Sequence, residues 1–147
     1  MRFLFLGLAA TAGLVMAVQG SLNAALNKII GLFPATLVVH IIGMFLAAGA
    51  VVLGLGRGSL AKIAAAPWYT YLGGMLNVLI IASVAVVIPR LGVASATTAI
   101  IVGQVLTALC LDHLGCFGLQ RVPFTWTKLL GLALLAAGAW LLLSMKN

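Results

Sequence analysis

Charged side chains are scarce in this sequence, and acidic ones are almost absent. Asp112 is the single acidic residue among 147, and only 6% of the residues are charged. Soluble domains have about a quarter charged residues, so this chain lacks the side chains to cover a soluble globule. Hydrophobic residues make up 65% of it, and the mean hydropathy is +1.31. The shortage of charge therefore predicts that most of the chain lies in lipid.

Basic clusters, metal-ligand sets and catalytic sets are also missing. The eight lysines and arginines lie singly between apolar runs, which argues against nucleic-acid binding. Cys110 and Cys116 have no metal-binding partners around them, so we interpret them as packing residues rather than as a disulfide or metal pair. The sequence shows no carboxylate pair, no Ser/His/Asp set and no glycine loop before a lysine. We expect no enzyme activity, no catalytic residue, no cofactor and no metal.

Long apolar segments are what the sequence does have. They cover residues 3–26, 34–55, 68–88, 93–111 and 124–145. Each is close to the ~20 residues that a helix needs to cross a bilayer. The first run continues to about Leu26, which is too long for the core of a signal peptide, and Pro89 is expected to end the third segment. We predict an all-α integral membrane protein with five transmembrane helices in a single domain, residues 1–147.

The positive charges give only a weak signal for orientation. With five crossings, one side would hold Arg2, Arg57, Lys62, Arg121 and Lys128, and the other Lys28, Arg90 and Lys146. An excess of positive charge on one side sets membrane orientation, and five against three is a small excess. A single orientation and insertion in both orientations therefore remain open. In a head-to-tail pair, Arg90 of one copy and Asp112 of the other would share a side, which makes them candidates for an inter-subunit pair. The alternative for Asp112 is a solvated position at a helix end.

Several amides and one histidine lie inside the apolar segments. Gln19 and Asn23 are four residues apart and share a helix face, which Asn27 continues. Polar groups in a bilayer tend to face protein or water. They either join helices, at about 0.6 kcal/mol per pair, or line a cavity. The candidates for a substrate cavity are Gln19, Asn23, His40, Asn77 and Gln104, and those for a gate or proton site are Asp112 and His113.

Small residues recur at the spacing of helix interfaces. Ser95, Ala99, Gly103 and Thr107 follow one another at intervals of four, and Gly13 lies in a similar run in the first segment. Such ridges let helix backbones approach closely in lipid. We expect these residues to pack against other helices.

The motifs resemble those of the YdcZ-type family of small bacterial inner-membrane proteins, within the drug/metabolite transporter superfamily. The resemblance lies in VQGSLNAAL, PWYTYLGGML, VIPRLG and GQVLTALCLDHLGCFGL. It implies a half-size, five-helix transporter that pairs as an antiparallel, dual-topology homodimer, mimicking a ten-helix transporter with inverted repeats. Gln19, Asn23, Gln104 and Asp112 are the matched positions, whereas His40 and Asn77 lie outside the family pattern.

Together these observations favour a small-molecule transporter of the bacterial inner membrane, an exporter that works by alternating access as an antiparallel homodimer. Its expected partners are a small-molecule substrate, membrane lipid and a second copy of itself, with no nucleic acid. No acidic residue lies inside a segment, which disfavours an organic-cation antiporter. A passive channel for a small solute or anion, and a structural subunit whose amides only join helices, remain the alternatives.

Overall fold

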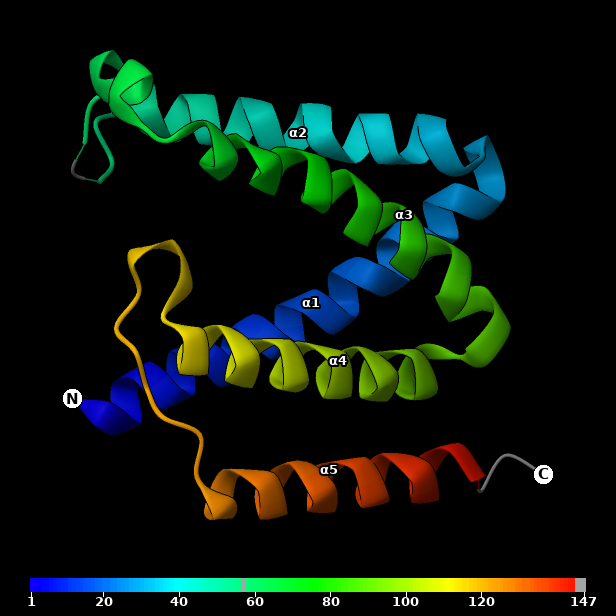
Figure 1. The fold of residues 1–147 in the computed structure, drawn as a ribbon. Coiled ribbons are helices and arrows are strands. Elements are labelled where there is room, and N and C mark those ends of the chain that lie inside the picture. Colours follow the sequence, from blue (N-terminus) through cyan, green and yellow to red (C-terminus); the bar gives the residue numbers. More distant parts are fainter. Residues whose placement is uncertain (57, 145–147) are drawn as a thin grey trace. The chain divides into compact units, whose positions relative to one another are not determined.

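The computed structural model describes residues 1–56 and 58–144, which form helices joined by short connections (Figure 1). The long helices are α1 (Arg2–Ile30), α2 (Leu32–Val52), α3 (Leu72–Leu91), α4 (Val93–Leu114) and α5 (Trp126–Ser144). All five are long and apolar enough to cross a membrane. The expected all-helical architecture with five spans is therefore confirmed, and the described ranges contain no strand.

The chain divides into two compact units, Met1–Arg90 and Leu91–Asn147. The first unit contains α1, α2 and nearly all of α3, and the second contains α4 and α5. Arg57 and Lys146, two of the charges counted for orientation, lie outside the described residues, as does residue 145 at the predicted end of the fifth segment.

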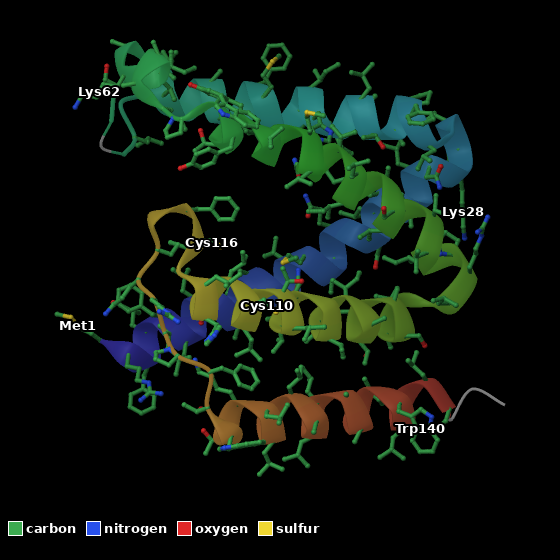
Figure 2. All side chains as sticks on the ribbon, in the orientation of Figure 1. Met1, Lys28, Lys62, Cys110, Cys116 and Trp140 are labelled. Atoms are coloured by element: carbon green, nitrogen blue, oxygen red, sulfur yellow. The ribbon has the colours of Figure 1, made fainter. Side chains whose placement is uncertain are left out.

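A single glycine joins α1 to α2. Gly31 adopts φ 86° and ψ 164°, a region of backbone conformation that is essentially restricted to glycine. This tight turn lets α1 continue four residues past its predicted end at 26, and the two helices pack against each other. Pro34 lies in the first turn of α2, where the backbone N–H has no partner within the helix, so the lack of this N–H in proline costs no helical hydrogen bond. Lys28 and Lys62 consequently lie at opposite ends of this unit (Figure 2).

The connection from α2 to α3 is ordered by two short 3-10 segments, η1 (Leu60–Ala65) and η2 (Trp68–Tyr71). The Ser59 hydroxyl accepts the Ala61 N–H at 3.2 Å and caps η1. The Tyr71 hydroxyl donates to the Ile63 carbonyl and ties the two segments together. Trp68 is 74% exposed, as expected for aromatic residues that lie at the membrane–water interface.

Pro89 does not end α3, contrary to the sequence prediction, because the helix continues through it to Leu91. A proline inside a helix removes the N–H that would bond the carbonyl four residues earlier, here that of Ala85. In the last turn of α3 the loss is confined to this carbonyl, and a neighbouring helix supplies another donor, as described below.

In the second unit, α4 and α5 run in opposite directions and pack against each other (Figure 1). The chain leaves α4 at Gly115, which adopts the left-handed conformation at φ 64°, and passes through the short segment η3 (Cys116–Gly118). Between the two helices lies a groove of about 530 Å³, lined almost entirely by apolar residues of α4 and α5 that include Ile101, Leu135 and Ala139.

The buried apolar side chains in the described residues are few and mostly small. They are Ala24, Ala35, Ile81, Ala85, Ile88, Ala96 and Ala139. Large apolar side chains stay exposed along the helices, for example Leu14 at 70% and Phe45 at 67%. Contiguous exposed apolar surface on this scale is rare in soluble monomers and marks contact with lipid or with other protein.

Candidate functional site

Four hydroxyl groups of the spans form hydrogen bonds within their own helices. Thr11, Ser21, Thr36 and Thr98 each donate to the carbonyl four residues earlier, at 2.8 to 3.0 Å. Such back-bonded hydroxyls need no partner on another helix. The amides are different, because each has two N–H donors and an acceptor oxygen that helix geometry alone does not satisfy.

The polar face predicted for α1 has a different environment at each of its three residues. Gln19 is exposed, Asn23 is buried with 7% of its surface exposed, and Asn27 is half-buried. Because the three follow one another at intervals of four, they form one stripe along α1. The stripe therefore runs from the open surface at Gln19 into contact with α3 at Asn27.

Asn27 takes the place of the N–H that Pro89 lacks. Its Nδ2 donates to the Ala85 carbonyl of α3 at 3.0 Å. In an uninterrupted helix the N–H of residue 89 would donate to that carbonyl, and proline has no N–H. Helix-breaking residues are tolerated in membrane spans when neighbouring helices satisfy the freed backbone groups. Asn27 thus has a structural role: from α1 it supplies the hydrogen bond that is missing in the last turn of α3.

A glycine allows α1 and α3 to approach closely at the same contact. A Cβ added at Gly20 would lie 3.0 Å from both Val84 Cγ1 and Ile88 Cδ1, and Gly20 itself is buried. Small residues at such crossings let backbones approach in lipid. The contact at Gly20 and the hydrogen bond from Asn27 together hold the second half of α1 against the end of α3.

His40 and Asn77, both predicted to line a cavity, are brought together from different helices of the first unit. His40 Nδ1 lies 2.7 Å from the Thr36 carbonyl of its own helix, α2. Its Nε2 lies 3.2 Å from Asn77 Nδ2 of α3. His40 is half-buried and Asn77 is exposed. The two residues, 37 positions apart in sequence, form a polar cross-link between α2 and α3.

In α4, the residues singled out from sequence are mostly at the open surface. Gln104, Ala99, Gly103 and Thr107 are exposed, and Ser95 is half-buried. Gly103 has no neighbouring atom within 4 Å of an added Cβ, and the same holds for Gly13 of α1. The packing role of these small residues stays a prediction.

The exit of α4 is completed by the chain that follows it. The last carbonyls of a helix have no partner within the helix. Here Val122 N–H donates to the Asp112 carbonyl at 2.8 Å, and Arg121 Nε donates to the His113 carbonyl at 2.8 Å. The His113 ring contributes as well, because its Nδ1 accepts the Phe124 N–H at 3.2 Å. A cation at a helix C-terminus is also favoured by the helix dipole. The Asp-His-Leu-Gly motif thus forms a structured cap.

The two candidate partners across a dimer are both without an ion pair in residues 1–56 and 58–144. Asp112 is half-buried and Arg90 is exposed. Their predicted pairing concerns a second copy of the chain and stays a prediction, as does the gate or proton role of Asp112 and His113.

Two features of the site were missed by sequence reasoning. The sequence contains a signal for the donor role of Asn27, because Pro89, if it lies inside a helix, leaves the Ala85 carbonyl without its helical N–H. The sequence alone does not say which side chain would replace the missing N–H. The cap formed by Arg121 and Val122 has a weaker signal in the sequence. That signal is Gly115, which comes two residues after His113 at the end of an apolar run.

These observations define a multi-pass helical membrane protein with amides and a histidine inside its spans. The model of the family described as "Putative inner membrane exporter, YdcZ" matches residues 4–141, which is nearly the whole chain. The chain belongs to this family, as its motifs indicated, and it is accordingly a multi-pass inner-membrane transporter of the exporter class. No curated protein and no solved structure matches the chain.

Proposed function

We propose that the protein exports a small molecule by alternating access as an antiparallel homodimer. The observation that carries the proposal is the exposure of amides inside the spans, at Gln19 of α1, Asn77 of α3 and Gln104 of α4. An amide moved from water into an apolar medium without a partner costs roughly 2–7 kcal/mol. These side chains therefore need protein or water around them rather than lipid tails, and a path for a polar solute would provide it.

A second copy is the simplest source of the rest of that path. Larger transporters of related architecture place their sites between two inverted repeats, and a five-span chain contains the equivalent of one repeat. The predicted charge difference between the two sides, five against three among the eight lysines and arginines, is small enough to permit both orientations. A twofold axis in the membrane plane would then give each half of the bilayer one copy of the α1 polar stripe.

The side chains of the spans suit a substrate that is not a cation. Gln19, Asn23 and Gln104 offer N–H donors and carbonyl acceptors without charge. The single acidic side chain of the sequence, Asp112, lies in the last turn of α4, at the exit of the span rather than deep inside it. We therefore assign neutral, amphipathic or anionic solutes as the substrate class, with the amides binding the solute or its water.

Cysteine accessibility tests whether the stripe lines a water-filled path. In full-length protein with Cys110→Ala and Cys116→Ala, no other cysteine remains. Gln19→Cys in native membranes should react with a small charged methanethiosulfonate reagent. Val18→Cys is the matched control, because Val18 is 60% exposed, lies at nearly the same depth and points about 100° away around the helix. Equal reaction of both positions, or reaction of neither, would overturn the cavity.

A reporter at the C-terminus tests the antiparallel pair separately. One reporter is active only in the cytoplasm and the other only outside it. Fused separately to the C-terminus of the same sequence, both should give signal. Signal from one side alone would overturn dual topology and with it the inverted homodimer. Shifting the charge balance by Arg2→Gln and, separately, by Lys28→Gln should move the two signals in opposite directions, because these residues lie at opposite ends of α1.

A further inference from the structure

His40 is the centre of a hydrogen-bonded chain in which each donor and acceptor can be assigned. The Thr36 carbonyl, 2.7 Å from His40 Nδ1, can only accept, so Nδ1 carries the hydrogen. In a neutral imidazole the other nitrogen then has a free lone pair. Nε2, 3.2 Å from Asn77 Nδ2, therefore accepts an N–H from the Asn77 amide. The geometry specifies one tautomer of a neutral ring.

Among the described residues of the first unit, the helix segments near His40 carry no other group that takes up or releases a proton. In α1 the charged residues are Arg2 in the first turn and Lys28 in the last, and α2 has no titratable side chain besides His40. In α3 the one charged residue is Arg90, at its far end. Among the described residues of the connection before α3, the titratable side chains are Lys62 and the tyrosines of η2.

His40 also lies deep within its span. It is the ninth residue of α2, about 12 Å along the helix axis from the first residue at a rise of about 1.5 Å per residue. Ionisable residues at such depth are costly and are associated with substrate, ion or proton pathways. Histidine is the side chain whose ordinary titration falls between about pH 5 and 8.

We propose that His40 is a proton-binding site and that its protonation breaks the link between α2 and α3. A hydronium ion transfers a proton to the Nε2 lone pair, which forms an N–H bond and leaves a water molecule. Nε2 thereby changes from an acceptor into a donor. The new N–H faces the Asn77 N–H, and the two repel. The hydrogen bond that Asn77 Nδ2 donates to His40 Nε2 is therefore lost. Nδ1 keeps its hydrogen and its bond to Thr36, so the ring stays anchored to α2.

This switch acts on one helix pair and leaves another intact. α3 remains joined to α1 through the Asn27 hydrogen bond to Ala85 and the close approach at Gly20, neither of which involves a titratable group. Proton binding therefore loosens α3 from α2 while α1 and α3 stay together. The use of this change to drive export by proton exchange rests on the proposed transport function, whereas the proton site itself does not.

The test reads the proton site directly, with the proton as the ligand and no substrate. Full-length protein in lipid nanodiscs carries ¹⁵N-labelled histidine and asparagine. His113→Gln leaves His40 as the only histidine, since the chain has two. At about pH 8 the spectrum should show a protonated Nδ1 and an unprotonated Nε2, and on lowering the pH to about 5 both nitrogens should become protonated.

The side-chain amide of Asn77 should shift over the same pH interval, and that of Asn23, in α1, should not. A His40 that stays neutral throughout the titration, as a purely structural histidine would, overturns the proposal. So does a titrating His40 with an unchanged Asn77 amide, because the link would then not respond. In His40→Phe the Asn77 amide should lose its pH dependence. These outcomes are independent of the accessibility and topology tests, which judge the transport function alone.

Discussion

Replacing Asn27 with leucine should destabilise the protein by about 1–2 kcal/mol. The substitution removes the donor that lies 3.0 Å from the Ala85 carbonyl and keeps the side chain similar in size. That carbonyl then has no partner, because Pro89 cannot donate. An unsatisfied buried polar group costs about 1–3 kcal/mol, and hydrogen bonds between membrane helices are worth about 0.6 kcal/mol on average and about 1.7 at most.

The cost should largely disappear in a Pro89→Ala background. Alanine at position 89 restores the N–H that donates to the Ala85 carbonyl within α3. A carbonyl has two lone pairs, so the single variant Pro89→Ala can keep the bond from Asn27 as well. In the double variant, Asn27→Leu should cost less than about 0.5 kcal/mol, which gives a coupling energy of about 1 kcal/mol in a double-mutant cycle.

Unfolding by SDS in mixed micelles, followed by the fluorescence of the three tryptophans, measures these free energies at a fixed protein concentration. Ser21→Ala is the control in α1, because Ser21 bonds only the Ala17 carbonyl of its own helix and its loss should change little. Equal costs of Asn27→Leu with proline and with alanine at position 89 would refute the assignment of Asn27 as the replacement donor.

Substitutions at two further sites, Gly20 and Gly115, test the close contacts in the same unfolding assay. Gly20→Ala adds a Cβ 3.0 Å from two side chains of α3 and should cost about 1 kcal/mol, since overpacking outweighs the gain in helix propensity. Gly7→Ala, with no atom within 4 Å, should stabilise, and equal effects of the two would contradict the close approach. Gly115→Ala, at φ 64° and with its Cβ 3.2 Å from Arg121 Cβ, should cost about 1 kcal/mol, whereas Gly115→Asn should cost less because asparagine tolerates this conformation. A larger loss with asparagine than with alanine would contradict the left-handed cap.

Much of the fold was predictable from local properties of the sequence. Apolar length identified the five spans, and the four-residue spacing of Gln19, Asn23 and Asn27 placed them on one face of α1. The helix ends were harder to predict. The expectation that Pro89 stops its helix was wrong because a proline in the last turn removes only one hydrogen bond, and a side chain from another helix supplies a donor for it.

The partners of the polar side chains were beyond sequence reasoning. His40 and Asn77 are far apart in the chain, and no periodicity relates them, so their contact depends on how α2 and α3 pack. For His113, the sequence offered a candidate gate or proton site at a helix exit. The structure adds that its Nδ1 accepts a backbone N–H from Phe124, a partner that only the folded-back loop can provide.

The cap on α4 has a consequence for the order in which the protein is built. The carbonyls of Asp112 and His113 receive their hydrogen bonds from Val122 and Arg121, which are synthesised after the whole of α4. Until the loop that contains Val122 and Arg121 reaches them, those carbonyls need other partners, such as water at the membrane surface. The C-terminal end of α4 is therefore finished only when the loop to α5 emerges, and biogenesis would favour release of α4 and α5 into the bilayer as one hairpin.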